Sequence, residues 1–289
     1  MTASLSVPII ESIQDLAGRY RVWFVDIWGV MHNGRDAFPN AAAATRAFRE
    51  GGGVVVLLSN SPRPSPDLQE QLRLFGVPDD AYDATVSSGD LTRHELSKHK
   101  GARVFHLGPE RDTAIFDAMD VTLTGPEEAD LTVCSGLFDD EVETPEDYVD
   151  LLSSMAARDL PMICANPDHK VERGHRLIYC AGALAAAYET LGGKTIYAGK
   201  PHRPVYELAL QTAAKVAPGT ISQSDVLAIG DGAKTDIVGA GVFGIPSVFV
   251  ASMLHAPGEN VGVLDAEHLS SLFAEEPSPP IAAMRGLAW

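Results

Sequence analysis

Charged and hydroxyl side chains stand where several apolar stretches of the chain end. Asp26 ends the apolar run in FVDIWGVMHNG, and Asp231 ends the one in VLAIGDGAKTDIVGAG. Ser59 and Asn60 end the run in VVVLLSNSPR, and Lys200 lies in AGKPHRPVY, ahead of a helix that begins with proline. Two carboxylates, a hydroxyl, an amide and an ammonium group suit a metal-assisted attack by an aspartate on a phosphoryl group.

Each of these segments is common in α/β proteins when taken alone, and the combination carries the prediction. A magnesium ion and Lys200 would neutralise the phosphoryl oxygens while Asp26 attacks and forms an aspartyl phosphate, which water then hydrolyses. Asp236, five residues beyond Asp231, adds a third carboxylate to the same region of the chain.

The elements that must position these groups alternate between short apolar runs and helical patterns. This alternation predicts a largely parallel, doubly wound sheet, in which ligands lie outside the carboxyl ends of the strands. The predicted strands are 22–25, 54–58, 104–107, 131–134, 162–165, 226–229 and 247–250. The predicted helices are 40–50, 66–75, 145–158, 174–191 and 204–215.

Length and charge limit the classes of protein. The 289 residues suffice for two domains with separate cores, and the formal net charge of -17 argues against binding to a nucleic-acid backbone. The chain has no apolar run long enough to span a membrane and no signal peptide at its start, which predicts a cytoplasmic protein without a membrane partner. The three cysteines are widely spaced, so we expect reduced core residues at Cys134, Cys164 and Cys180.

The four segments, in this order and spacing, resemble motifs I to IV of the haloacid dehalogenase superfamily. The resemblance is closest to class IIA, which contains 4-nitrophenylphosphatase-like and pyridoxal phosphatase-like enzymes, and it covers nearly the whole chain. It implies a phosphomonoester hydrolase that acts on a small phosphorylated metabolite. The implied fold is a three-layer Rossmann-like core with a parallel sheet and an inserted α/β cap of the C2 type.

The resemblance also implies roles for individual residues. Asp26 matches the nucleophile, Ser59 the hydroxyl of motif II, and Lys200 the lysine of motif III. The implied ligands of Mg²⁺ are Asp26, the main-chain carbonyl of Trp28, and Asp231, with waters completing an octahedral shell. The residues implied to support this site from behind are Asp236 and Asn60.

About 140 residues separate motifs II and III, which is too many for a loop and enough for a domain. We therefore expect a discontinuous core of residues 1–99 and 195–289 and a cap of residues 100–194. The segment ICANPDHK resembles the part of class IIA caps that contacts the substrate, although a polar turn after a strand would also explain it. The implied substrate-binding residues are Asn166, Asp168, His169 and Lys170. Relatives of this class also form dimers through the cap, so a homodimer is a further expectation.

The sequence departs from the superfamily pattern at Trp28, where related phosphatases have an aspartate that serves as general acid and base. An indole does not exchange protons at neutral pH. His32, six residues beyond Asp26, is a candidate substitute because its ordinary pKa of about 6.5 suits proton transfer. A solvated loop histidine is the alternative explanation, and His169 and His202 are weaker candidates.

Two other functions remain open at this stage. A C–halogen hydrolase also uses an aspartate nucleophile and needs no protonated leaving group. A non-catalytic binding protein derived from a phosphatase would explain Trp28, although the retention of Asp26, Ser59, Lys200 and Asp231 argues against it. The identity of the substrate is not encoded in these motifs, because it depends on contacts in the cap.

Overall fold

The computed structural model describes residues 7–173, 176–251 and 264–289. The chain forms two compact units, and each is described by itself. The first unit consists of residues 1–59, 69–86 and 200–289, and the second of residues 60–68 and 87–199. Within the described residues, no helix is both long and apolar enough to cross a membrane.

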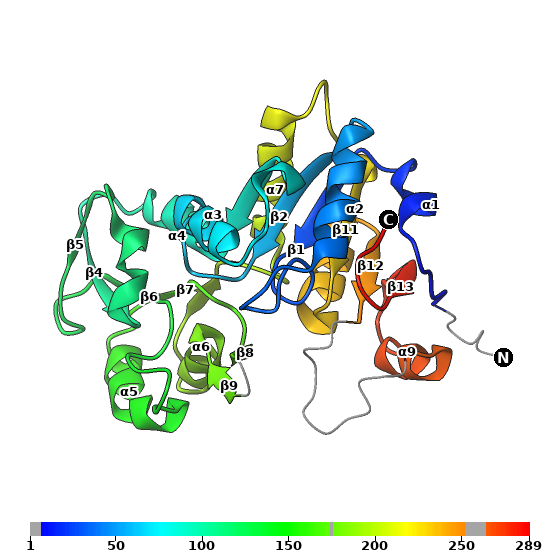
Figure 1. Cartoon of the computed structure of the whole chain (residues 1–289). Helices are drawn as coiled ribbons and strands as arrows, with labels where there is room; N and C mark the ends of the chain where they lie inside the picture. Colours follow the sequence, from blue (N-terminus) through cyan, green and yellow to red (C-terminus); the bar gives the residue numbers. More distant parts are fainter. Residues whose placement is uncertain (1–6, 174–175, 252–263) are drawn as a thin grey trace. The chain divides into compact units, whose positions relative to one another are not determined.

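The first unit is built on a six-stranded sheet in the order β13-β12-β11-β1-β2-β3 (Figure 1). The four neighbouring pairs from β13 to β2 are parallel. The strands are β1 (Val22–Asp26), β2 (Val54–Ser59), β3 (Ala84–Ser87), β11 (Val226–Gly230), β12 (Ser247–Val250) and β13 (Ala282–Met284). Every residue of β1, β2 and β11 is buried, as expected for central parallel strands covered on both faces.

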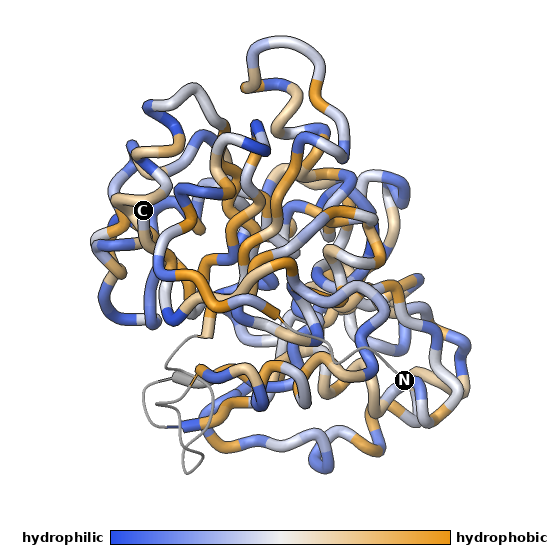
Figure 2. Tube along the Cα trace, turned by 90° about the vertical axis from the view of Figure 1, so that its right-hand side faces the viewer, coloured by the Kyte–Doolittle hydropathy of each residue, from blue (hydrophilic) through white to orange (hydrophobic). Residues whose placement is uncertain are grey.

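Helices of the first unit cover this sheet, and α2 and α7 both contact β2. The helical elements of this unit are α1 (Gln14–Ala17), α2 (Pro39–Glu50), η1 (Asp79–Ala81), α7 (Arg203–Val216), η4 (Gln223–Asp225), η5 (Ala233–Ile237), α8 (Val238–Phe243) and α9 (Ala266–Leu272). Helix α3 (Ser65–Leu74) continues from the second unit into the first. Figure 2 shows apolar residues concentrated in inner segments of the trace and polar residues along many of its outer turns.

The second unit has a separate five-stranded parallel sheet in the order β10-β7-β6-β4-β5, together with an antiparallel hairpin of β8 and β9. Its strands are β4 (Ala102–Leu107), β5 (Val121–Leu123), β6 (Leu131–Cys134), β7 (Met162–Cys164), β8 (Lys170–Arg173), β9 (Arg176–Tyr179) and β10 (Thr195–Tyr197). Its helices are α4 (Ser88–Leu96), η2 (Glu110–Phe116), η3 (Pro145–Tyr148), α5 (Val149–Ala157) and α6 (Ala181–Thr190).

The second unit also has a hydrophobic core of its own, to which α5, α6, β6 and β7 contribute. Cys134 and Cys164 are paired neighbours on β6 and β7 within this core. All three cysteines are buried and reduced, as the sequence predicts. Burial raises the pKa of Cys134 to about 12 and the pKa of Cys164 well above its usual value, so both thiols remain protonated at neutral pH.

The α/β fold with parallel sheets is confirmed, and one predicted element is wrong in part. The predicted helix 174–191 begins only at Ala181, because residues Arg176–Tyr179 form β9 and pair with β8. Residues 174 and 175 lie outside the described residues. The predicted helix 145–158 is divided between the short helix η3 and α5. The strands β3, β5, β8, β10 and β13 also lie outside the runs predicted as strands, and β5, β10 and β13 have only three residues each.

Candidate active site

The register of the first unit's sheet brings the candidate residues to one edge. Val25 pairs with Ile229, so Asp231 lies just beyond the end of β11, next to the end of β1 that carries Asp26. On the other side of β1, Asp26 pairs with Leu58, and Ser59 is the next residue along β2. All of these strands run in the same direction, which places their carboxyl ends together.

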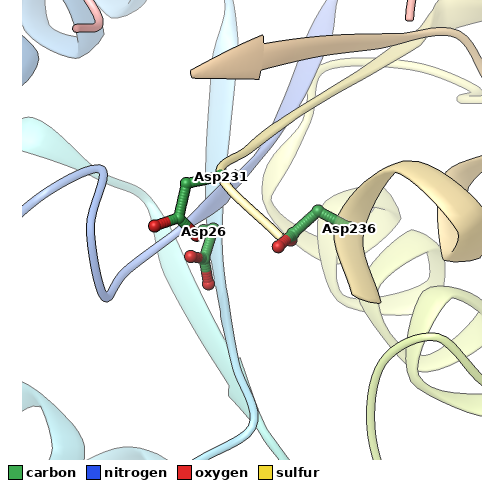
Figure 3. A group of neighbouring side chains, drawn as sticks. All are labelled: Asp26, Asp231 and Asp236. Carbon is green, nitrogen blue, oxygen red and sulfur yellow. The ribbon is translucent and has the colours of Figure 1, made fainter. Parts of the chain in front are cut away.

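Three buried carboxylates gather at this edge. Asp26, Asp231 and Asp236 each offer an oxygen atom, and these oxygens all lie within 4.8 Å of one another. Figure 3 shows Asp26 and Asp231 side by side at the strand ends, with the Asp236 carboxylate directed toward them from the following helical turn. Each of the three side chains is nearly inaccessible to solvent.

Lys200 supplies a positive charge to the same cluster. Its buried ammonium group forms ion pairs with Asp26 and with Asp236, and the distance from Nζ to Asp236 Oδ1 is 2.9 Å. Three carboxylates against one ammonium group leave a formal surplus of two negative charges when all four groups are ionised. The cluster is therefore short of positive charge.

The pKa values of the cluster reflect this imbalance. Burial raises the pKa of Asp26 well above its usual range, and the charges of Asp236 and Asp231 raise it further against the opposing effect of Lys200. Burial also raises the pKa of Asp236. Burial alone would lower the pKa of Lys200, but the charges of Asp236 and Asp26 outweigh burial and hold that pKa well above its usual value. Lys200 thus stays charged, and the negative charge of each carboxylate disfavours ionisation of its neighbours.

Two glycines allow Asp236 to approach the strand end. A Cβ atom on Gly230 would lie 2.2 Å from Cγ of Asp236, and one on Gly232 would lie 2.8 Å from its Oδ2. The backbone N–H of Gly232 donates to Asp236 Oδ2 at 3.2 Å. Residues Ala233–Ile237 form a single π-helical turn, a feature that is frequent at functional sites. The segment GDGAKTD therefore holds two carboxylates close together.

Tyr206 is a supporting residue that the sequence reasoning missed. It lies on α7, and its buried hydroxyl group donates to the backbone carbonyl of Asp236 at 3.3 Å. Its ring also stacks on Phe243 of α8. Tyr206 thus ties the turn that carries Asp236 to the helix that follows Lys200. Nothing distinguishes this tyrosine in the sequence from an ordinary core aromatic residue on an amphipathic helix.

The loop after β1 holds Trp28 and His32 in fixed positions. The indole ring packs directly on Gly34, where a Cβ atom would lie 2.4 Å from Cη2 of Trp28. His32 contacts the indole edge to face with ring centroids 5.3 Å apart, and its Nδ1 accepts a hydrogen bond from the Gly34 N–H at 2.9 Å. Trp28 is half-buried, and a smaller side chain at position 28 would leave Gly34 without its packing partner.

The role of His32 in proton transfer stays a prediction, but the structure changes the pKa on which that prediction rests. The side chain is 2% exposed, and burial lowers its pKa to about 4. His32 is therefore neutral at pH 7, with the hydrogen bond from Gly34 leaving the proton on Nε2. The alternative of a solvated loop histidine is wrong, because the ring is enclosed between Trp28 and Phe75.

The predicted substrate-binding segment belongs to the second unit. It follows β7 and leads into the β8–β9 hairpin, where Lys170 places its ammonium group 4.2 Å from the ring centroid of Tyr179. His169 and Lys170 are exposed, whereas Asn166 and Asp168 are half-buried. Asn60, predicted to support the phosphate site, also belongs to this unit, and its amide donates to Asp168 Oδ1 at 2.9 Å.

The structure thus brings the predicted residues together in two groups. Within the first unit, Asp26, Asp231, Asp236 and Lys200 form one buried cluster, and Ser59 lies at the end of the neighbouring strand. The residues of the second group, within the second unit, are Asn60, Asn166, Asp168, His169 and Lys170. His202 caps the start of α7 by its position and lies two residues beyond Lys200.

Comparisons with known proteins show the family to which the chain is related. The chain matches a family described as haloacid dehalogenase-like hydrolase over residues 23–122 and a second HAD-hydrolase-like family over residues 197–268. A haloacid dehalogenase-like hydrolase from Brucella suis 1330 has a similar structure, with a TM-score of 0.86 and 46% sequence identity. That alignment covers 97% of this chain and 100% of the Brucella chain.

Two curated proteins are similar in sequence. The 5'-nucleotidase YutF of Bacillus subtilis is 24% identical over 87% of this chain and 91% of its own length. The ribonucleotide monophosphatase NagD of Escherichia coli K12 is 26% identical over 78% of this chain and 86% of its own length.

The chain belongs to the haloacid dehalogenase-like hydrolase family. The superfamily membership predicted from the motifs is confirmed, as is the prediction of a HAD-like hydrolase. The α/β fold class is confirmed as well.

Proposed function

We propose that this protein is a magnesium-dependent phosphomonoester hydrolase that acts on a small phosphorylated metabolite with Asp26 as nucleophile. The observation that carries the proposal is the buried cluster of Asp26, Asp231 and Asp236 around the ammonium group of Lys200. A structural core seldom gathers three carboxylates out of water, because each burial costs free energy unless a positive charge compensates it. The names of the similar proteins, a nucleotidase and a nucleotide monophosphatase, support the same reaction class.

The cluster fits a divalent cation. Oxygen ligands from carboxylates are the ligands that Mg²⁺ prefers, and two positive charges would balance the formal surplus of two negative charges. We propose Asp26, Asp231 and the main-chain carbonyl of Trp28 as its protein ligands, with Asp236 held back by Lys200 and the Gly232 N–H. When bound, the ion would withdraw negative charge from the phosphoryl oxygens and hold the carboxylate of Asp26 in its ionised form.

The side chains of the first unit would then have separate roles in the reaction. An oxygen of Asp26 attacks phosphorus, the bond from phosphorus to the leaving oxygen breaks, and an aspartyl phosphate results. The ammonium group of Lys200 and the hydroxyl of Ser59 bind the phosphoryl oxygens and stabilise the charge that develops on them. Water attacks phosphorus in a second step, which releases inorganic phosphate and regenerates Asp26.

The second unit is proposed to act as the cap. Residues 100–194 form its predicted extent, and its loop from Asn166 to Lys170 is proposed to contact the organic part of the substrate. The exposure of His169 and Lys170 makes these two side chains available for such contacts. A cytoplasmic location and a homodimer remain predictions of the sequence, as does the absence of a membrane or nucleic-acid partner.

The function is tested by measuring phosphate release from a panel of phosphorylated metabolites, with Mg²⁺ and with a chelator. The panel should contain nucleoside monophosphates, sugar phosphates, glycerol phosphate, pyridoxal phosphate and 4-nitrophenyl phosphate. Asp26→Asn is the matched control, since it preserves the shape of the side chain and removes the nucleophile. The proposal expects magnesium-dependent release that disappears in the variant. A wild-type protein that releases no phosphate, or one equally active as Asp26→Asn, contradicts it.

A further inference from the structure

Three residues of the second unit that lie next to points where the chain passes between the units are close together. Asn60 follows one such point, Ser88 lies beside another, and Gly199 precedes a third. A Cβ atom on Gly199 would lie 2.3 Å from Oγ of Ser88 and 2.6 Å from Oδ1 of Asn60. Gly199 therefore packs against both residues, and three distant segments of sequence meet at one place.

The loop proposed to contact the substrate is attached at this same place. The side-chain amide of Asn60 donates to Asp168 Oδ1 at 2.9 Å, across 108 residues of sequence. Pro167 lies beside Gly199, where a Cβ atom would be 2.8 Å from its Cδ. A hydrogen bond to a carboxylate is stronger than one between neutral groups, so this contact restrains both side chains.

The backbone of Asp168 forms two hydrogen bonds, which hold it in place. Its N–H donates to Asn166 Oδ1 at 3.1 Å, and its carbonyl oxygen accepts from the Gly182 N–H at the same distance. Asp168 is half-buried, whereas the next two residues, His169 and Lys170, are exposed. The loop thus separates one anchored carboxylate from two exposed side chains.

We propose that Asp168 is a positioning residue that acts through Asn60, and that substrate discrimination falls to its exposed neighbours in the loop. Asn60 directly follows Ser59, the hydroxyl proposed to bind the phosphoryl group, so restraint of Asn60 restrains the backbone that presents Ser59. This inference rests on the proposed function. It implies that loss of the contact lowers turnover of every phosphorylated substrate by a common factor, because every substrate shares the phosphoryl group.

The test is a double-mutant cycle with exchanged partners. Asn60→Asp alone places two carboxylates against each other, and Asp168→Asn alone places two amides there. The combined variant, Asn60→Asp with Asp168→Asn, restores one hydrogen bond with donor and acceptor reversed. We expect each single variant to lower kcat/KM by about 10- to 100-fold, the usual weight of a charged hydrogen bond, and the combined variant to recover most of that loss. The factor should be the same for 4-nitrophenyl phosphate and for a nucleoside monophosphate.

His169→Ala is the matched control from the same loop. It should change the ratio of kcat/KM between the two substrates while leaving the Asn60–Asp168 coupling intact. Additive losses in the combined variant overturn the inference. Asp168→Asn could also change the ratio of kcat/KM between the two substrates, both with Asn60 and with Asn60→Asp. That result overturns the inference as well, because it would place Asp168 against the substrate.

Melting temperatures of the four proteins separate this inference from the proposed function. The coupling should also appear as a lower melting temperature of each single variant and recovery in the combined one. A wild type without any phosphatase activity would remove the proposed function, and the melting temperatures would still report the contact. Coupling in melting temperature without coupling in turnover rejects the positioning role, and absence of both rejects the contact itself.

Discussion

The two units share an architecture but differ in the side chains that it brings together. Each has a parallel sheet whose strands carry polar residues at their carboxyl ends. In the first unit these ends present Asp26 and Asp231, with Lys200 beside them. In the second unit the ends of β6 and β7 carry Cys134 and Cys164, both protonated because burial raises their pKa values.

The second unit also joins three polar side chains in a network near the end of β6. Ser135, just beyond β6, bridges His106 and Asp112, and the distance from His106 Nε2 to Ser135 Oγ is 2.9 Å. Burial lowers the pKa of His106 to about 4, so the histidine is neutral at pH 7. The first unit gathers three carboxylates at its sheet edge, whereas this network of the second unit contains one carboxyl group beside a neutral histidine. The carboxyl ends of parallel strands form a common location for ligand sites, and the charged side chains at those ends determine whether the site can catalyse a reaction.

The largest expected effect is that of Asp26→Asn. It should lower kcat by at least about 1,000-fold, because loss of a nucleophile removes the reaction path itself. The metal-free variant should melt at the same temperature as the wild type or higher, since the raised pKa of Asp26 shows that its ionised form is disfavoured in the fold. Phosphate release and thermal unfolding check the two parts. Activity within tenfold of the wild type would remove Asp26 from the reaction.

The next effect concerns the leaving group and Trp28. With no carboxylate at this position, the wild type should prefer aryl and acyl phosphates, and its rate should fall steeply as the pKa of the leaving group rises. Trp28→Asp should raise the hydrolysis of alkyl phosphates by up to about 100- to 10,000-fold, the usual contribution of a positioned general acid. Rates for a series of esters with graded leaving groups measure this directly.

The Trp28→Asp variant needs a stability control. It removes an indole that packs on Gly34 and contacts His32, so its melting temperature must be measured alongside the rates. If the wild type already hydrolyses alkyl phosphates with a shallow dependence on the leaving group, another residue supplies the proton. The comparison of turnover in His32→Ala then decides whether that residue is His32, despite its low pKa.

A smaller effect is expected for Asp231→Asn. Replacing a charged oxygen ligand with a neutral one should raise the magnesium concentration for half-maximal activity by at least about 10-fold. Titration of phosphate release with MgCl₂ gives this concentration for the wild type and the variant. An unchanged value would exclude Asp231 from the metal site and shift attention to Asp236, the third member of the cluster.

The smallest effect on activity is expected for Ser135→Ala in the second unit. Ser135→Ala removes the bridge between His106 and Asp112 and should lower the free energy of unfolding by about 1–3 kcal/mol, the cost of leaving buried polar groups unpaired. Turnover should change by less than about threefold, since the network forms no part of the carboxylate cluster. Urea denaturation and phosphate release measure the two effects. A large loss of turnover in a stable variant would place catalytic function in the second unit as well.

The sequence predicted the residues of the first cluster because their motifs end apolar strands. Parallel pairing brings such ends together whatever the details of packing, so Asp26 and Asp231 were found from local pattern alone. The β9 strand was missed because the segment Arg176–Tyr179 leads directly into the alanine-rich helix α6, and its extended form depends on pairing with β8. Tertiary pairing outweighs local propensity in such short segments.

The burial of individual side chains also could not be predicted from the sequence. The ordinary pKa of a histidine suggested a proton donor at His32, yet packing against Trp28 and Phe75 makes the ring neutral. The contact between Asn60 and Asp168 joins residues 108 positions apart, and no spacing rule connects them. Long-range contacts of this kind depend on the complete fold.

The most direct test of the account is to trap the covalent intermediate. Turnover of a phosphorylated substrate is quenched in acid, and borohydride then reduces any acyl phosphate, which converts the modified aspartate to homoserine. Mass spectrometry of the peptides locates the converted residue. The account predicts homoserine at position 26 in the wild type and none in Asp26→Asn. Homoserine at a different aspartate, or its presence at the same level without substrate, would contradict the assignment of Asp26 as the nucleophile.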